Sequence, residues 1–396
     1  MAAIPINANT VAPEKNFFIC ISILLPSTII PRRSQKGSII ADIVIKFNMR
    51  RVFSLAMLIV GAIIGAGFAT GKEISSFFGS PAPPLIALAV GLCLFLLCFG
   101  FCLLGSVLKA KDFADVNKKL LKKFGYVADF FLVLNSLIVL SAMLSGMDSL
   151  LNGVIPLSPL YSTFSGVICA LIVSKGLKSV INSSLLLAPV MVIIILAICL
   201  LNFGDTSPYP ITSKSLGGAI TYVCMNIMLA CTALVGVNEK PKTIFWASLI
   251  AAFIMTMLML FIIFALNGSD VADDDMPLIK LASESKLTYY PFLFAVAASI
   301  FTTMTTAMNG LTDFLGKKLD NVAAPCALIL GLIVSNLGFA GVINYLYPII
   351  GAAGIIYVVL CLSASVSNRN LFHCGNDEIH DARKQTKNNR RRHDKV

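Results

Sequence analysis

The segment best suited to ligand chemistry interrupts the first long apolar stretch of the chain. It reads VGAIIGAGFATGKE over residues 60–73, with glycines at 61, 65, 67 and 71 followed by Lys72 and Glu73. A glycine inside a helix costs about 1 kcal/mol relative to alanine, and charges within a membrane are usually functional. The pattern predicts a discontinuous helix whose unwound backbone offers carbonyls and amides to a ligand and a cation. A small-residue packing face, with Gly61 and Gly65 as a GxxxG pair, is the alternative.

A second polar cluster lies in a later apolar stretch, between residues 289 and 313. Its members are hydroxyl and amide side chains: Ser299, Thr302, Thr303, Thr305, Thr306 and Asn309. Such hydroxyls often bond to the preceding helical turn, but hard cations also take oxygen ligands of this kind. The cluster is therefore either satisfied within its own helix or a source of cation ligands.

The elements that carry these residues are predicted to be membrane-spanning helices. The chain of 396 residues is 57% hydrophobic and 13% charged, whereas soluble domains are about 25% charged. Unbroken apolar runs of about 20 residues favour helices over barrel strands. We expect ten spans, at 52–76, 84–108, 126–149, 160–174, 183–203, 216–236, 243–266, 289–313, 323–339 and 341–364.

The lysines of the connecting loops predict the orientation. Six lie between 109 and 123, two between 175 and 178, two between 240 and 242, and two at 317 and 318. The alternate loops hold only Lys214, Lys280 and Lys286. By the positive-inside rule, this split places both termini in the cytoplasm.

Three regions are expected along the chain. Residues 1–48 fit the pattern poorly, and Met49-Arg50-Arg51 before an apolar helix favours Met49 as the natural start. A short apolar run at 17–30 is a weak alternative as a span or signal core. Residues 49–366 form the membrane domain, and 367–396 form a basic, disordered cytoplasmic tail.

Several functions find no support in the sequence. The formal net charge of +11 resides in short loops and the tail, so the membrane explains it and no nucleic-acid partner is expected. No Walker A motif, HExxH motif or nucleophile–base set occurs, which argues against ATP-driven transport and against an enzyme. The cysteines lie mostly in apolar runs and are interpreted as small buried hydrophobes.

The segment GAIIGAGFATGKEI, residues 61–74, resembles the first helix of bacterial YkvI-type membrane proteins of the amino acid–polyamine–organocation superfamily. The resemblance runs from about Met49 to the end of the tenth helix. It implies an all-α fold of two inverted five-helix repeats, with helices one and six discontinuous. It further implies a secondary transporter of the bacterial cytoplasmic membrane. Pro189 and Pro348, in the last span of each half, are a weak repeat signal.

The resemblance also implies a sodium site. In sodium-coupled relatives, carbonyls of helix one meet hydroxyls of helix eight. On this chain the matching positions are Gly61 and Ile64 with Ser299, Thr302 and Thr303. A lysine on helix five replaces the cation in some sodium-independent relatives, and span 183–203 contains none. Sodium is thus expected as the coupling ion, with no other cofactor.

A substrate site is expected beside the break. Backbone amides of residues 66–68, at the start of the second half-helix, suit a carboxylate. The predicted lining residues are Ala62, Gly65, Ala66, Gly67, Phe68, Met143, Tyr222 and Asn226. For Asn226 an interhelical hydrogen bond is equally plausible. Glu73 is the candidate proton or cation coupling residue, with pairing to Lys72 or snorkelling as alternatives.

The function favoured by this reasoning is symport of an amino acid or similar small organic solute, coupled to sodium or else to protons. A ligand-sensing receptor on the same fold, as in some spore-germination subunits, is the second hypothesis. An ion channel is the third and is least supported, because few charges lie within the spans. The lipid bilayer and a small solute are the expected partners, and the oligomeric state is not predicted.

Overall fold

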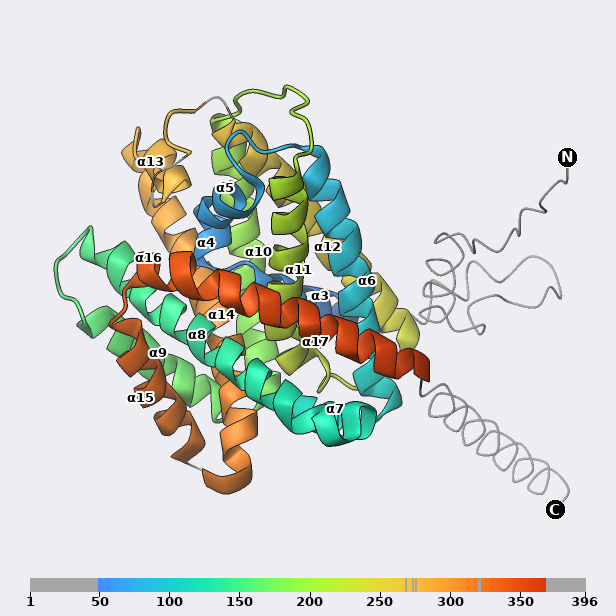
Figure 1. Ribbon diagram of the computed structural model, residues 1–396. Helices are drawn as coiled ribbons and strands as arrows, with labels where there is room; N and C mark the ends of the chain where they lie inside the picture. Colours follow the sequence, from blue (N-terminus) through green and yellow to red (C-terminus); the bar gives the residue numbers. More distant parts are fainter. Residues whose placement is uncertain (1–48, 268, 273, 275, 320–321, 368–396) are drawn as a thin grey trace, which may run out of the picture. The chain divides into compact units, whose positions relative to one another are not determined.

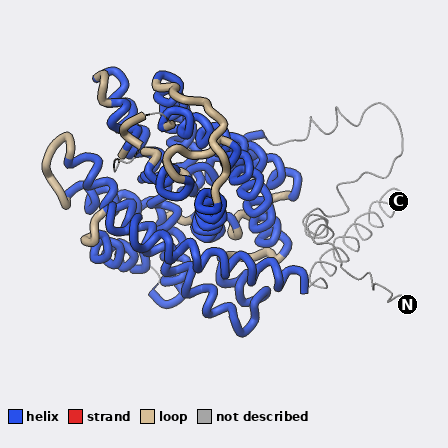
Figure 2. The backbone as a smooth tube through the Cα atoms, turned by 45° about the horizontal axis from the view of Figure 1, so that its top comes forward, coloured by secondary structure: helices blue, strands red, loops and turns tan. Residues whose placement is uncertain are grey.

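The computed structural model describes residues 49–267, 269–272, 274, 276–319 and 322–367. Within these ranges the chain consists of helices joined by turns and loops, without a strand (Figure 2). The all-helical fold class is therefore confirmed. The predicted N-terminal extension at 1–48 and the tail from 368 onward lie outside the described residues.

Helices occupy every range predicted to be a span (Figure 1). Their bounds are α3 Met49–Ile63, α4 Ala66–Ala69, α5 Lys72–Phe78, α6 Leu85–Val107, α7 Phe113–Leu121, α8 Gly125–Asn152, α9 Leu160–Val173, α10 Leu177–Leu201, α11 Ser213–Leu234, α12 Pro241–Leu266, α13 Pro277–Ala282, α14 Lys286–Leu319, α15 Ala323–Ser335, α16 Phe339–Gly341 and α17 Tyr347–Ser367. A 3-10 turn, Lys122–Phe124, joins α7 to α8, and a π-helical turn, Val342–Leu346, joins α16 to α17.

Seven helices of the described residues are long and apolar enough to cross a membrane, namely α6, α8, α10, α11, α12, α14 and α17. The shorter apolar helices α9 and α15 accompany them, and α3 to α5 form a broken helix. Large side chains such as Leu92 on α6, Ile193 on α10 and Phe253 on α12 are exposed. Helices that are apolar on their outer face need lipid as solvent. The chain is a polytopic membrane protein.

The helices of the two halves pack crosswise. The first helix of one half contacts the second of the other: α3 packs on α12, and α11 packs on α6. Likewise α8 packs on α15 and α14 on α9, while α10 lies against α3 and α17 against α11. Short helices α7 and α13 follow α6 and α12 at matching places (Figure 1). These contacts are reciprocal between residues 49–201 and residues 213–367.

The break in the first helix is confirmed, but the predicted break in the sixth is wrong. Helix α11 runs without interruption from Ser213 to Leu234. Between Tyr222 and Leu234 the sequence contains neither glycine nor proline, so nothing there removes a backbone hydrogen bond or lowers the cost of unwinding. The sixth helix was expected to break by resemblance alone.

The tenth helix instead carries a local irregularity. The turn Val342–Leu346 is π-helical and passes directly into α17, whose second residue is Pro348. Proline lacks the backbone N–H that would bond to the residue four positions earlier. A π-turn is a common way for a helix to absorb such an interruption.

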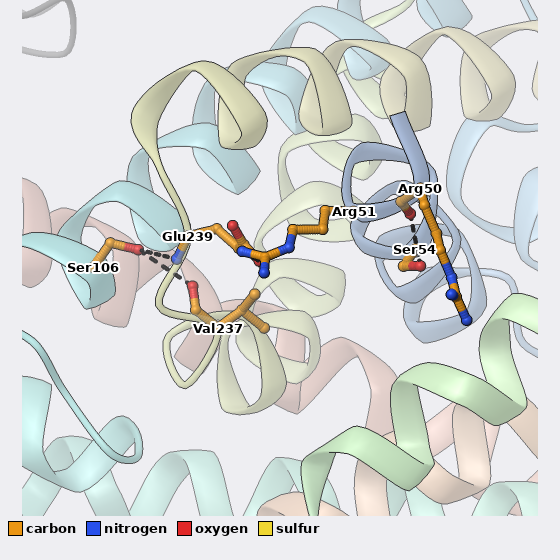
Figure 3. Close-up of polar contacts among 6 residues, drawn as sticks. All are labelled: Arg50, Arg51, Ser54, Ser106, Val237 and Glu239. Atoms are coloured by element: carbon orange, nitrogen blue, oxygen red, sulfur yellow. Dashed lines mark hydrogen bonds and ion pairs between the residues drawn. The ribbon is translucent and has the colours of Figure 1, made fainter. Parts of the chain in front are cut away.

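Helix α6 ends in close backbone contact with the α11–α12 connection (Figure 3). Ser106 Oγ donates to the carbonyl of Val237 at 3.2 Å and accepts from the amide of Glu239 at 3.3 Å. The preceding residue, Gly105, has no side chain, and a Cβ there would lie 2.6 Å from Val235 Cα. This approach therefore requires glycine, since a backbone atom cannot move aside as a flexible side chain does.

Gly105→Ala is expected to lower the free energy of unfolding by about 1–3 kcal/mol, because overpacking forces two helix ends apart. Gly217→Ala, on α11, is the control, since a Cβ at Gly217 meets no atom within 4 Å. It should be neutral or stabilising by up to about 1 kcal/mol through helix propensity. Thermal unfolding of both variants in detergent measures the difference, and equal melting temperatures would contradict the close approach.

Candidate functional site

The candidate site is built around two residues that interrupt the first helix. Helix α3 ends at Ile63, and α4 begins at Ala66. The intervening Gly65 is extended, with φ −94° and ψ −172°, and Gly71 between α4 and α5 is left-handed, with φ 81°. The left-handed backbone at Gly71 favours glycine, whereas the extended backbone at Gly65 is open to any residue. The break lies within the glycine-rich segment that predicted it.

Thr303 of α14 meets the backbone carbonyls that the break leaves without helical partners. Its hydroxyl lies 3.1 Å from the carbonyl oxygen of Gly61 and 3.1 Å from that of Ile64. One hydroxyl hydrogen is thus shared between two buried acceptors from a helix 239 or more residues away in sequence. Buried carbonyls need such partners because no water is available to them.

Two further side chains, those of Ser184 and Thr302, lie close to Gly61. A Cβ at this position would lie 3.1 Å from Ser184 Oγ of α10 and 3.2 Å from Thr302 Cβ of α14. Ser184 is fully buried, and its hydroxyl has no hydrogen-bond partner within the described residues. The carbonyls of Gly61 and Ile64 and the hydroxyls of Thr303 and Ser184 thus gather where α3, α10 and α14 meet.

This oxygen set has the chemistry of a hard-cation site. Oxygens about 2.4 Å from a hard cation, as for Ca²⁺, stand about 3.4 Å apart at right angles. The 3.1 Å separation between Thr303 Oγ1 and each carbonyl is close to that spacing. A cation here requires that the Thr303 hydroxyl turn its hydrogen away and present a lone pair.

The other predicted cation ligands are directed into their own helix. Thr302 Oγ1 donates to the carbonyl of Ser299 at 3.0 Å, and Ser299 Oγ donates to the carbonyl of Val296 at 2.7 Å. Both hydroxyls are thereby self-satisfied, as hydroxyls in helices often are. The structure brings Thr302 beside Gly61, whereas the Ser299 hydroxyl is bonded within α14.

Helix α8 covers the break from another side. A Cβ on Gly65 would lie 3.4 Å from Met143 Cε and 3.5 Å from Thr303 Oγ1. One turn along α8, a Cβ on Gly146 would lie 3.7 Å from Ala66 Cβ. Met143, Gly65 and Ala66, all predicted to line the substrate site, are thus together. Ala62, Gly67 and Phe68 are buried in the same broken segment.

Glu73 folds back over the start of the second half-helix. A Cβ on Gly67 would overlap the Glu73 carboxyl group, so the two residues are in direct contact. Glu73 is buried, and its Oε2 atom has no hydrogen-bond partner within the described residues. Lys72 donates to the carbonyl of Asp274 at 3.0 Å, in the α12–α13 connection. No ion pair between Glu73 and Lys72 is found within the described residues.

Tyr222 of α11 packs against α5 about one helical turn beyond Glu73. Its ring meets the edges of Phe77 and Phe78 at centroid distances of 5.7 Å and 5.6 Å. Its buried hydroxyl lacks a partner in the described structure. Asn226, by contrast, donates to the carbonyl of Tyr222 at 3.0 Å, and its side chain makes no hydrogen bond to another helix within the described residues.

Two residues of this region escaped sequence reasoning. Ser184 is one of several hydroxyl residues at the start of α10, and only the helix phase distinguishes it from Ser183. Tyr347 lies within electrostatic range of Glu73, as Tyr222 does, although it begins α17, far away in sequence. No local pattern marks either residue.

Thr303→Val should lower the free energy of unfolding by about 1–3 kcal/mol in sodium-free buffer, because two buried carbonyls lose their donor. Thr303→Ser keeps the hydroxyl and should restore most of that stability. Thr305→Val is the matched control: Thr305 donates to the carbonyl of Thr302, which also accepts from Thr306. Its cost should be about 0.5 kcal/mol. Equal losses for both valine variants, measured by chemical denaturation in detergent, would contradict the special role of Thr303.

Comparison with known proteins agrees with this architecture. No known protein-family profile matches the chain. It is 26% identical over 340 residues to the membrane protein YkvI of Bacillus subtilis, covering 78% of this chain and 95% of YkvI. It is also 24% identical over 331 residues to YyaD of the same organism, covering 77% of this chain and 94% of YyaD.

Two solved structures share the fold. MhsT in complex with L-phenylalanine matches with a TM-score of 0.59 and 16% identity, over 81% of this chain and 88% of MhsT. Mhp1, a nucleobase-cation-symport-1 family transporter with bromovinylhydantoin bound, matches with a TM-score of 0.57 and 14% identity. The match covers 78% of this chain and 77% of the Mhp1 chain. The chain is therefore related in sequence to the YkvI-type membrane proteins and shares the fold of MhsT and Mhp1.

Proposed function

We propose that this protein is a secondary active transporter that couples the uptake of an amino acid or similar small organic solute to sodium. The observation that carries the proposal is the meeting of Thr303 with the carbonyls of Gly61 and Ile64. An unwound membrane helix whose carbonyls face a hydroxyl of another helix is suited to a cation that must bind and leave. Ser184 is proposed as a further oxygen ligand on α10.

The solute is proposed to bind on the other side of Gly65. The first amides of α4, at residues 66–68, have no preceding helical carbonyl and suit a carboxylate. MhsT was solved with L-phenylalanine, which supports an amino acid. Mhp1 was solved with bromovinylhydantoin, so a ring of the nucleobase type belongs in any ligand screen.

Alternating access would move α3 relative to the helices around it. At its first turn α3 is held by Arg51, whose guanidinium lies 3.5 Å from the Glu239 carboxylate (Figure 3). The Arg51 side chain is 61% exposed, and exposed ion pairs contribute at most about 1 kcal/mol. A contact this weak permits that end of α3 to swing away. We place both termini in the cytoplasm of a bacterial cell, with the two halves acting as inverted repeats.

The test is a thermal-shift screen of the purified protein in detergent, with amino acids, amines and nucleobases in sodium and in choline buffer. A ligand at 100 times its Kd should stabilise the protein by about 2.7 kcal/mol. We expect sodium alone to raise the melting temperature and one solute class to add to it. Sodium-driven uptake into proteoliposomes then separates a transporter from a receptor, which would bind without uptake.

Ser184→Lys should abolish the sodium response while keeping the fold, because the lysine ammonium would replace the cation beside Gly61. Ser183→Lys is the matched control, since the neighbouring residue points about 100° away around α10 and is half-buried. It should keep the sodium shift. Should Ser184→Lys fail to fold, Thr303→Ala provides the second variant, with a sodium affinity expected to fall at least about tenfold. A sodium shift that survives both changes would show that sodium binds elsewhere in the protein, whereas a wild-type protein indifferent to sodium would favour proton coupling.

A further inference from the structure

Glu73 presents a carboxyl group that lacks a donor in the interior of the protein. The residue is 3% exposed, and Oε2 accepts no hydrogen bond from any described residue. No ion pair joins Glu73 to a described cation, and Lys72 is hydrogen-bonded at Asp274. A carboxylate in such a place is strongly destabilised unless it is protonated or paired with a positive charge.

A second orphaned polar atom belongs to Tyr222, whose ring packs on Phe77 and Phe78 of α5, the helix that carries Glu73. The Tyr222 hydroxyl is fully buried and has no hydrogen-bond partner in the described part of the chain. The Glu73 carboxyl interacts electrostatically with both Tyr222 and Tyr347. These three groups come from α5, α11 and α17, so the cluster is a product of the tertiary structure.

The cluster lies at the proposed solute position. The Glu73 carboxyl is packed against Gly67, in the middle of α4, whose first amides are proposed to hold a carboxylate. In an α-amino acid the carboxylate and ammonium are separated by a single carbon. A solute with its carboxylate at the start of α4 would thus bring its ammonium toward Glu73.

We propose that Glu73 and the Tyr222 hydroxyl bind the ammonium group of the transported solute, with Tyr347 completing the polar surroundings. The assignment rests on the proposed function and narrows it to solutes that carry a primary or secondary ammonium. An ammonium has three N–H donors, and two of them match the two orphaned acceptors. A proton on Glu73 neutralises the carboxyl group but adds only one donor, whereas an ammonium group can serve Glu73 Oε2 and the phenolic oxygen at the same time.

The experiment uses the full chain and compounds that differ in one group. Each of the twenty amino acids is tested beside its N-acetyl derivative, which removes the positive charge, and its decarboxylated amine, which keeps it. Binding is measured by thermal shift and then by calorimetry in sodium buffer. We expect at least one amino acid or amine to bind and its N-acetyl derivative to bind on the order of 100-fold more weakly.

Three variants locate the effect. Glu73→Gln preserves shape and should weaken binding of the amine by on the order of 10- to 100-fold. It should also remove the discrimination against the N-acetyl compound. Tyr222→Phe keeps the ring contacts with Phe77 and Phe78, and a smaller loss is expected. Glu284→Gln, which removes an exposed carboxylate from the α13–α14 connection, should change nothing.

The possible outcomes distinguish a failure of the proposed ammonium site from a failure of the proposed transporter function. If N-acetyl compounds bind as tightly as their parents, if Glu73→Gln binds the amine normally, or if no ammonium compound binds at all, the ammonium site is wrong. Sodium-driven uptake of an uncharged nucleobase would then leave the transporter function intact. If Glu73→Gln instead abolishes only the pH dependence of uptake, Glu73 carries a proton and the ammonium assignment is overturned.

Discussion

An interrupted backbone inside a membrane must find its hydrogen bonds within the protein, and this constraint organises the centre of the molecule. The break at Ile64 and Gly65 leaves carbonyls that cannot turn to water. Thr303 satisfies two of them with one hydroxyl, which requires α14 to approach α3 closely. That approach in turn requires small residues where the helices meet. The hydrogen bonds of Thr303 therefore form only if the surrounding helices pack closely, and close packing depends on the small residues between them.

The glycines of the first helix illustrate how packing and ligand chemistry coincide. Gly61 faces Ser184 and Thr302, and Gly65 faces Met143 and Thr303, while Gly67 faces Glu73. A GxxxG pair serving one neighbouring helix would place both glycines against the same partner. Here both glycines meet α14, while Gly61 also meets α10 and Gly65 also meets α8. The sequence offered a small-residue packing face and a discontinuous helix as alternatives. The structure contains both.

The sequence predicted what depends on local composition and not what depends on tertiary contact. Apolar runs indicated the helical ranges, and the glycine-rich segment 61–71 indicated where the first helix breaks, because both are local features of composition. The sixth helix was wrongly expected to break, since that expectation came from resemblance while residues 222–234 hold no glycine or proline. Ser184 and Tyr347 could not be found in advance, because their roles depend on the rotation of α10 and on the place where α17 begins. Thr303 was anticipated, but its neighbour Ser299 proved to be satisfied within α14.

Coupling between a cation and a solute needs a physical link, and the first helix supplies a short one. The carbonyls of Gly61 and Ile64 end one half of the helix, and Ala66 begins the other, so only Gly65 separates the two groups of atoms. A cation bound to the two carbonyls would fix their orientation. It would thereby also fix the orientation of α4 and the position of Glu73, which follow the break in the chain. Binding free energies linked in this way are reciprocal: whatever the cation contributes to solute affinity, the solute contributes equally to cation affinity. Gly65 would then be the element through which both proposed ligands act, and a Cβ there would lie in ordinary contact with Met143 and Thr303, at 3.4 Å and 3.5 Å.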